Sequence, residues 1–259
     1  EYNRQDTALL AKLEKKLKFI ELANEIAHQN TVLLQTTMGA VAVTEQAIVN
    51  ETHRRGMIVP GRKYRDKNAE PMSAAGAYVA TPQKGIHDWI GSIDINSLYP
   101  SVIRALNMGP ETIVGQIRPI ITSAEINRAK HAKKSFAASW DGQFGSWEYQ
   151  AVMNQEKGTE VVIDWEDDTS VRMSAAQLYD LVFDGNNKWM LSANGTLFTY
   201  EYEAIIPGLL KRWYEERQEM QRKMRECGDN EIEREYWDKR QLVKKINLNS
   251  LYGAILNPG

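Results

Sequence analysis

A long, highly charged stretch near the C-terminal end of the chain constrains the fold most strongly. Helical spacing runs from just after Pro207 to about Glu226, and again from about Glu231 to Tyr252. Only the turn-forming residues Cys227-Gly228-Asp229-Asn230 separate the two runs. Each helix would be roughly 30 Å long at about 1.5 Å per residue. The pattern therefore predicts an antiparallel pair of helices joined by a short turn.

The N-terminal part predicts one amphipathic helix from Asp6 to about Ala27, with Asp6-Thr7 capping its start. Its apolar residues recur at helical spacing: Leu9, Leu10, Leu13, Leu17, Ile20, Leu22 and Ile26. The next stretch, 31–48, carries mixed helix and strand signals. From Gly56 to about Ser73 the polar, Pro-containing sequence predicts an exposed connection and a boundary between domains.

Two short strands are predicted at 76–79 and 89–95, with the turn-forming residues Pro82 and Gly85 between them. A helix is predicted from Ser97 to Leu106. Pro100 is compatible with it, because it falls in the first turn, where no backbone donor is needed. The junction between the second strand and this helix carries several polar residues.

The segment 123–189 predicts an insertion or subdomain with a basic helix at 124–138 and alternating strands near 160–165 and 170–173. A further helix is predicted after the capping-box pattern Ser174-Ala175-Ala176-Gln177. Beyond it, the stretch 191–202 predicts a hairpin that turns at Ala193-Asn194-Gly195. Helices and hairpins in this arrangement indicate an α+β fold.

Composition excludes several classes of protein. With 42% hydrophobic and 25% charged residues among 259, the chain is neither collagenous nor disordered. Its single cysteine, Cys227, permits no internal disulfide, and its four histidines make no metal-spaced pair. A net charge of −2 argues against a protein that wraps nucleic acid over its whole surface, although it leaves room for a local basic groove. The chain begins at Glu1 and looks like a piece of something longer.

The first group with recognisable chemistry is Asp94-Ile95-Asn96-Ser97-Leu98-Tyr99-Pro100-Ser101. A carboxylate that leaves a strand beside the start of a helix can hold a hard divalent cation, while the amides of the following turn face an anion. Magnesium prefers one or two carboxylates plus phosphate oxygens and water, so one aspartate here supplies only half of a site. The alternative is that Asp94 merely caps the helix.

The second group is Lys245-Ile246-Asn247-Leu248-Asn249-Ser250-Leu251-Tyr252-Gly253. Lys245, Asn249 and Tyr252 are spaced i, i+4 and i+7, which puts a cation, an amide and an aromatic ring on one helix face. Such a face can hold a polyphosphate at one end and a base or sugar at the other. The alternative for each residue taken singly is a solvated surface position.

Together the two groups resemble a known family. Asp94-x-x-Ser97-Leu98-Tyr99-Pro100-Ser101 resembles motif A, and Lys245-x-x-x-Asn249-Ser250-x-Tyr252-Gly253 resembles motif B, of family B DNA polymerases. The nearest likeness is to the replicative polymerases of large tailed bacteriophages. The opening Tyr2-x-x-x-Asp6 is similar to the third motif of the attached 3′→5′ exonuclease. Further likenesses lie at 76–82, 110–113 and 192–195.

The resemblance implies a role for each matching residue. Asp94 would be the catalytic aspartate that binds both metal ions, with the Ile95 carbonyl also near a metal. Ser97 and Leu98 would hold triphosphate oxygens through their amides, and Tyr99 would stack under the sugar and exclude a 2′-hydroxyl.

The helical pair would contribute the remaining contacts to the nucleotide. Lys245 and Asn249 would face the triphosphate, and Tyr252 with Gly253 would lie beside the nascent base pair. Arg217 would clamp the γ-phosphate, as planar bidentate contact suits phosphate. Gln221 stands where the phage polymerases carry a second basic residue, and either neighbour, Arg222 or Lys223, is a candidate substitute.

The resemblance implies a partial polymerase: half of a palm made of an antiparallel sheet with helices, an inserted α+β subdomain, and antiparallel two-helix fingers. The expected parts are the exonuclease edge, the connection into the palm, the palm with motif A, the insertion, the palm hairpin, and the fingers with motif B. In the same order they span residues 1–27, 28–84, 85–122, 123–189, 190–206 and 207–259.

The complete enzyme would add dNTPs to a primer 3′ end with two Mg²⁺ ions about 3.5–4 Å apart. No Asp-Thr-Asp of motif C follows motif B in this sequence, so the chain alone is expected to be inactive. Its expected partners are primer-template DNA, dNTP, and a chain or segment that supplies motif C, the thumb and the first two exonuclease motifs. No membrane is expected, and the location would be the host cytoplasm. The alternative function is a non-catalytic nucleic-acid-binding or assembly subunit of a split polymerase.

Overall fold

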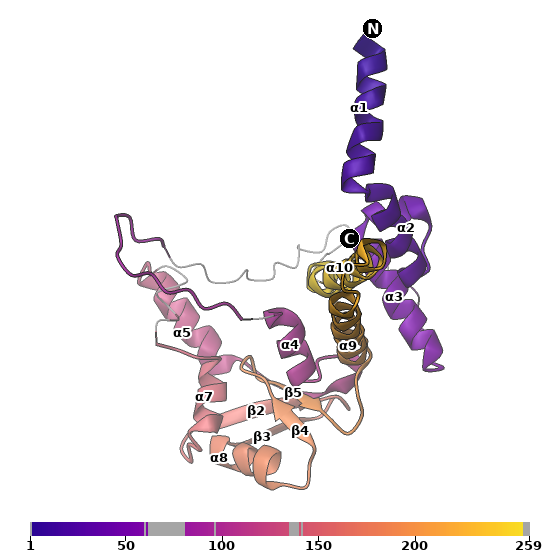
Figure 1. The fold of residues 1–259 in the computed structure, drawn as a ribbon. Coiled ribbons are helices and arrows are strands. Elements are labelled where there is room, and N and C mark those ends of the chain that lie inside the picture. The colour runs from indigo at the N-terminus through magenta and orange to yellow at the C-terminus, as the bar shows by residue number, and fades with distance from the viewer. Residues whose placement is uncertain are drawn as a thin grey trace. The chain divides into compact units, whose positions relative to one another are not determined.

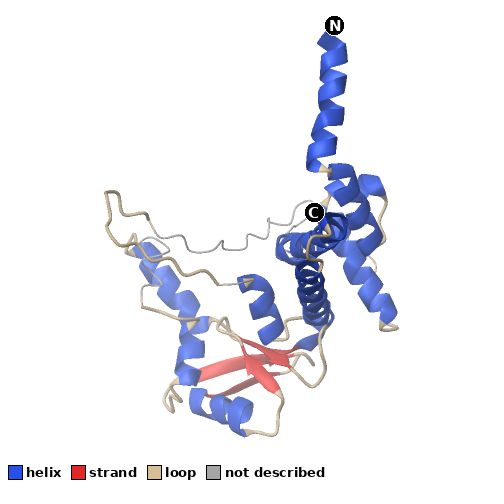
Figure 2. Ribbon diagram, viewed as in Figure 1, coloured by secondary structure: helices blue, strands red, loops and turns tan. Residues whose placement is uncertain are grey.

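The computed structural model describes residues 2–59, 61, 81–95, 97–134, 140 and 142–255 (Figure 1). Helices and one five-stranded antiparallel sheet confirm the α+β class (Figure 2). The chain forms two compact units. The first comprises Glu1–Ala74, Asn96–Pro100 and Gly208–Gly259, and the second comprises Ala75–Ile95 and Ser101–Pro207. No helix in the described ranges has the length and apolarity that crossing a bilayer requires.

Two helices stand where the sequence predicts one. Helix α1 runs from Tyr2 to Leu17 and α2 from Phe19 to Asn30. Lys18 separates them because its backbone is left-handed, with φ 53° and ψ 40°. The predicted cap at Asp6-Thr7 is also wrong, since α1 already begins at Tyr2 and the Thr7 hydroxyl donates 2.8 Å to the Asn3 carbonyl within the helix.

The stretch 31–48, for which the sequence gives mixed helix and strand signals, lies within the described residues and contains helices and no strand. A short 3₁₀ helix, η1, spans Leu34–Met38, and α3 spans Ala40–Arg54. The two predicted C-terminal helices are confirmed as α9 (Ile205–Glu226) and α10 (Glu231–Ile255). Helix α9 starts two residues before Pro207, which is tolerated in the first turn.

One face of α10 is buried in the first unit, where α10 packs against α2 and α3. Its buried apolar residues, Val243, Leu248 and Leu251, are at most 2% exposed. Asn247 lies on the same face, and its Nδ2 donates to Oδ1 of Asn30 at 3.0 Å. Because both amides are buried, this hydrogen bond satisfies two polar groups that would otherwise be costly to bury.

A buried carboxylate joins α3 to α9 in the same unit. Glu51 is 1% exposed and pairs with Arg54 at 2.7 Å, Arg55 at 2.9 Å and Arg212 at 2.6 Å. Burial alone would raise the pKa of Glu51. The hydrogen bonds from Arg54 and Arg55 and the charge of Arg212 nevertheless lower it from 4.5 to about 2. The carboxylate is therefore ionised and fully engaged at neutral pH.

The second unit is built on a sheet of strand order β3-β2-β1-β5-β4, in which every neighbouring pair is antiparallel. The predicted strands near 160–165 and 170–173 and the predicted hairpin are confirmed, and Gly195 supplies the positive φ, 89°, at its turn. The central strand, β1, is not among the strands predicted from the sequence. The strands are β1 (Ile113–Ile117), β2 (Glu160–Trp165), β3 (Ser170–Ser174), β4 (Trp189–Leu191) and β5 (Thr196–Thr199).

One core holds this unit together. Ile117, Ile163, Leu178 and Leu197 are at most 1% exposed and form one cluster with Val152. The cluster combines residues from 123–189 with residues on either side of that segment. The strands and helices of 123–189 therefore complete the same sheet and core as β1 and β5.

Helix caps position the remaining elements of the second unit. Glu148 of α7 (Trp147–Met153) accepts hydrogen bonds from the amides of Ile121 and Thr122 at 2.6 and 3.1 Å. The basic helix predicted at 124–138 is shifted toward the N-terminus: α5 runs from Ile120 to His131, and the described residues 132–134 that follow it are not helical. The capping box at Ser174 is confirmed and opens α8 (Ala175–Tyr179), which continues as a π-helical turn, η3 (Asp180–Asp184).

The elements predicted between residues 76 and 106 are confirmed only in part. The predicted helix is confirmed as α4 (Leu98–Ala105), and a short 3₁₀ helix, η2 (Pro110–Thr112), precedes β1. The predicted strand at 89–95 is wrong, because no described strand pairs with it and its residues are exposed. The predicted strand at 76–79 lies outside the described residues.

Replacing Glu51 tests the charge cluster of the first unit. Glu51→Gln should lower the free energy of unfolding by about 2–3 kcal/mol, because it leaves the arginines without their buried counter-charge. Glu45→Gln, an exposed position on α3, is the matched control and should change stability by less than about 0.5 kcal/mol. Urea denaturation at neutral pH measures both.

The stabilisation that Glu51 provides should depend on pH. Because the folded chain lowers the pKa of Glu51, its stabilising contribution is complete above the ordinary value of 4.5. The contribution is lost as pH falls toward about 2. The stability difference between wild type and Glu51→Gln should shrink over that interval. A difference that stays constant on acidification would contradict the assignment.

Candidate functional site

Helices α9 and α10 contact each other through side chains of the first unit. Glu216 pairs with Lys244 at 2.6 Å, Gln221 donates to Gln241 at 3.5 Å, and the Lys223 ammonium lies 4.5 Å from the centre of the Trp237 ring. As the residue number rises along α9, the partner's number falls along α10. The two helices therefore run antiparallel, as the sequence predicts.

Helix α10 presents different residues on its two sides. Lys244 is 7% exposed and turns toward Glu216 of α9, whereas the adjacent Lys245 is exposed. Asn249 and Gly253 are exposed, and Tyr252 is half-buried. The spacing of Lys245, Asn249 and Tyr252 puts them on one face, away from the residues that pack on α2 and α3.

Arg217 reaches across to this side of α10. Its Nε donates 3.3 Å to Oε1 of Gln241, and Nε2 of Gln221 donates to the same oxygen. Gln241 lies one helical turn before Lys245 on the same face of α10. Arg217, which contacts Gln241, is therefore on the same side of α10 as Lys245. Gln241 was not identified from the sequence, although its i−4 spacing from Lys245 was the available signal.

The neighbours of Gln221 have other partners. Arg222 binds Glu219 at 2.6 Å and Glu226 at 2.7 Å on its own helix, and these carboxylates raise the pKa of its guanidinium. Lys223 lies over Trp237 and 3.7 Å from Glu219. Arg222 is thus already neutralised by two acidic side chains, and Gln221 itself carries no charge.

The two tyrosines of the motifs meet within the first unit. The rings of Tyr99 and Tyr252 stack with their centres 4.0 Å apart and their planes 11° from parallel. Burial, together with the neighbouring Tyr99 hydroxyl, raises the pKa of Tyr252. Ser97, with φ 52°, precedes α4, and Leu98 and Tyr99 in its first turn are 44% and 42% exposed. An aromatic surface therefore lies next to helix-start amides.

Asp94 and Ile95 belong to the second unit and lie in a segment without regular secondary structure. Both are exposed, and no hydrogen bond or ion pair within the described part of the chain engages the Asp94 carboxylate. A carboxylate and a backbone carbonyl are the hard oxygen donors that Mg²⁺ accepts, and they fit part of a magnesium site. Among the described residues no group of three or more His, Cys, Asp or Glu side chains is arranged to hold a metal.

The residues similar to an exonuclease motif lie on α1. Tyr2 is 79% exposed and Asp6 is exposed. Several apolar side chains of α1 and the start of α2 are exposed as well: Leu9, Leu10, Leu13, Leu17, Phe19 and Ile20. Helix α1 has no buried residue.

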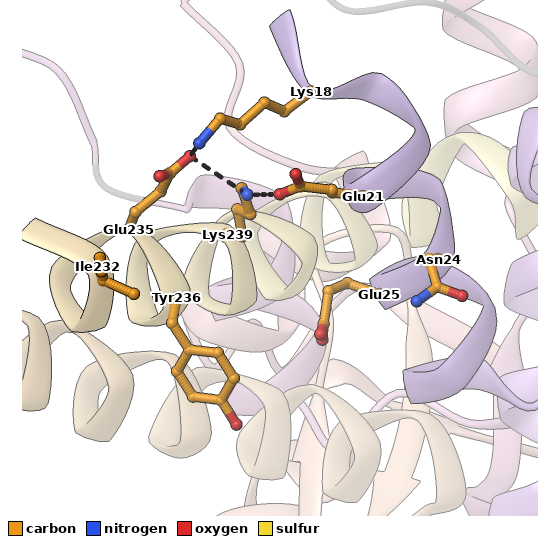
Figure 3. A pocket seen from close by; sticks show the side chains of 8 residues that line it. All are labelled: Lys18, Glu21, Asn24, Glu25, Ile232, Glu235, Tyr236 and Lys239. Carbon is orange, nitrogen blue, oxygen red and sulfur yellow. Dashed lines mark hydrogen bonds and ion pairs between the residues drawn. The ribbon is translucent and has the colours of Figure 1, made fainter. Parts of the chain in front are cut away.

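A pocket of the first unit lies where Lys18 and α2 meet α10 (Figure 3). Lys18 pairs with Glu235, Lys239 pairs with Glu21, and Lys239 also lies 3.2 Å from Glu235. Burial and the nearby Lys18 lower the pKa of Lys239. Glu25, which also lines the pocket, pairs with Arg240 at 3.4 Å. The charged side chains of this pocket therefore already have charged partners, and these ion pairs join α2 to α10.

Known proteins similar to this chain include phage and archaeal polymerases. A DNA-directed DNA polymerase of Escherichia phage RB69 is 26% identical over 117 residues, which cover 45% of this chain and 12% of that protein. The corresponding enzyme of Enterobacteria phage T4 is 29% identical over 117 residues, covering 45% of this chain and 13% of that protein. A DNA polymerase of Pyrococcus glycovorans is 26% identical over 215 residues, covering 82% of this chain and 19% of that protein.

This chain thus spans between 12% and 19% of the length of these relatives. The family described as DNA polymerase family B matches residues 30–256, which include both the Asp94 and the Lys245 motifs. Since that match covers most of the sequence and agrees with both motifs, the chain belongs to DNA polymerase family B.

Proposed function

We propose that this chain is part of a DNA-directed DNA polymerase that adds dNTPs to a primer 3′ end on a DNA template. The observation that carries the proposal is the arrangement of α9 and α10. There Arg217 crosses to the α10 face that also holds Lys245, Asn249 and Tyr252. The family membership supports the same reading, because the match includes both helices.

The triphosphate would lie along the exposed face of α10. Arg217 can offer its terminal guanidinium nitrogens to two phosphate oxygens at once, which a lysine cannot do. Lys245 adds a point charge and Asn249 an amide donor on the same face. The amides of Ser97 and Leu98, at the start of α4, would hold further phosphate oxygens. Gln221 contributes a neutral contact in this proposal.

The nucleoside end would lie against the tyrosines. Tyr99, stacked on Tyr252, offers a flat surface beneath a deoxyribose, and its ring would occupy the volume that a 2′-hydroxyl needs. Tyr252 and Gly253 would lie beside the nascent base pair. Selection of the sugar would then come from steric exclusion, and binding of the phosphates from charge.

Asp94 and the Ile95 carbonyl would hold magnesium, which supplies charge stabilisation for the attacking and leaving oxygens when bound. The carboxylate of Asp94 is free to serve in this way, since no described residue pairs with it. A second carboxylate is needed on the other side of the site, and a partner chain or segment with motif C would supply it. The same partner would supply the thumb.

The six-part division into exonuclease edge, connection, palm, insertion, palm hairpin and fingers remains part of the proposal. In it, Tyr2 and Asp6 on α1 contribute to an exonuclease site whose other motifs come from elsewhere. Primer-template DNA and dNTP are the proposed ligands. A viral replication protein of this kind would act in the host cytoplasm.

Complementation tests the catalytic part of the proposal. The 259-residue chain alone should not extend a primer, because Asp94 is its one carboxylate in the proposed polymerase site. Adding the segment that carries motif C and the thumb should restore extension, and Asp94→Asn should then reduce the rate at least about 100-fold. Asp88→Asn, an exposed aspartate of the same segment, is the matched control and should retain activity.

Two results would contradict this account. Extension by the purified chain alone, equal in the Asp94→Asn variant, would show that the catalytic centre is misplaced. DNA binding without extension in every complemented preparation would instead favour the non-catalytic assembly subunit.

A sugar-selection assay tests Tyr99. In the complemented polymerase, Tyr99→Ala should raise ribonucleotide incorporation relative to dNTP incorporation by at least about tenfold, because the ring no longer excludes the 2′-hydroxyl. Tyr200→Ala, at a 50% exposed tyrosine of the second unit, should leave the ratio unchanged. Single-turnover extension with each nucleotide gives the ratio. An unchanged ratio for Tyr99→Ala would remove this residue from sugar selection.

A further inference from the structure

The arginines of α9 differ in what neutralises them. Arg212 binds the buried carboxylate of Glu51 at 2.6 Å, and Arg222 binds Glu219 and Glu226. Arg217 lies between them on α9, and its Nε donates to a neutral acceptor, the amide oxygen Oε1 of Gln241. A neutral acceptor orients a guanidinium and leaves its positive charge in place. A carboxylate orients the guanidinium but also cancels its charge.

Gln241 is itself held in place. Its Nε2 donates 2.9 Å to Oδ1 of Asp238 on the same helix, which points Oε1 toward α9. There Oε1 accepts from Nε of Arg217 and from Nε2 of Gln221. Because Nε is the inner nitrogen of the guanidinium, this contact leaves both terminal nitrogens available for an anion.

We propose that Gln241 is a positioning residue that holds Arg217 across the helical pair while leaving its positive charge for the triphosphate. This inference rests on the proposed function, since it assumes that Arg217 binds a phosphate. Gln241 is not one of the nucleotide contacts proposed above. Its role as a positioning residue explains why a neutral amide stands at this position. A glutamate at this position would form a stronger bridge but would neutralise the cation.

A positioning role and a structural role for Gln241 predict different effects of a charge change at this residue. If Gln241 only joined the two helices, Gln241→Glu would strengthen the bridge to Arg217 and leave nucleotide binding unchanged. If it preserves the charge of Arg217, Gln241→Glu weakens dNTP binding although the bridge to Arg217 is kept. Thermal stability should fall slightly in this variant, because a carboxylate oxygen then faces Oδ1 of Asp238 in place of the amide nitrogen. Gln241→Met, of similar length but without the amide, loses the orientation alone.

The experiment measures the dNTP dissociation constant and the maximal rate in single-turnover primer extension by the complemented polymerase. Gln241→Glu should raise the dissociation constant about tenfold and Gln241→Met about threefold, with DNA affinity unchanged. Neither substitution should have a further effect in the Arg217→Ala background, because Gln241 acts through that side chain. Gln218→Glu, an exposed α9 position with the same charge change, is the control and should match wild type.

A second measurement uses the 259-residue chain by itself. The Nε–H of Arg217, followed by ¹⁵N NMR, should exchange slowly with solvent in wild type and at least about threefold faster in Gln241→Met. Equal exchange rates would show that the hydrogen bond is not maintained in solution and would overturn the inference.

Three kinetic outcomes distinguish this inference from the proposed function. An Arg217→Ala enzyme with unchanged dNTP affinity would defeat the proposed phosphate contact itself. A weakened Arg217→Ala enzyme with unaffected Gln241 variants would overturn the positioning role alone. A Gln241→Glu effect that persists in the Arg217→Ala background would show a general effect of added negative charge and would also overturn it.

Discussion

The packing of one face of α10 on α2 and α3 determines what the other face presents. Val243, Leu248 and Leu251 are buried there, and the hydrogen bond between Asn30 and Asn247 satisfies the two amides enclosed with them. Rotating α10 by one residue would bring Lys245 toward this buried face and break that hydrogen bond. The exposed positions of Lys245 and Asn249 therefore follow from apolar burial on the opposite side.

Charge pairing adds a second level of order to the first unit. Glu51 binds Arg212 of α9, Glu216 binds Lys244 of α10, and Lys18 and Lys239 join the start of α2 to α10. Each of these cations is therefore paired with a carboxylate. Arg217 and Lys245 differ from them, since no carboxylate among the described residues pairs with either one. The chain has a net charge of −2, but Arg217 and Lys245 provide positive charge locally, where we propose that the triphosphate binds.

The elements that could be predicted from sequence are those with strong local signals. The two long helices have helical spacing and a clear turn between them, and the capping box at Ser174 and the Asn-Gly turn specify their own geometry. The break at Lys18 could not be predicted, because a lysine in a left-handed conformation has no residue signature. Strand β1 was missed because it is short and its partners, β2 and β5, come from distant parts of the chain.

The site shows the same division between local and long-range information. Spacing alone places Lys245, Asn249 and Tyr252 on one face of α10, as observed. The contacts of Gln241 with Arg217 and of Tyr99 with Tyr252 join residues 24 positions apart in one case and on separate motifs in the other. Such contacts depend on how the helices pack, so no pattern within one segment could reveal them.

Photoaffinity labelling can identify the parts of the chain that hold the triphosphate, which we propose to be α9 and α10. A dATP analogue with a photoreactive group on its γ-phosphate would be irradiated with the complemented polymerase and a primer-template that calls for dATP. The account predicts that mass spectrometry finds the adducts on the peptides of α9 and α10 that contain Arg217 and Lys245. Adducts confined to α1, or to the strands of the five-stranded sheet, would contradict it.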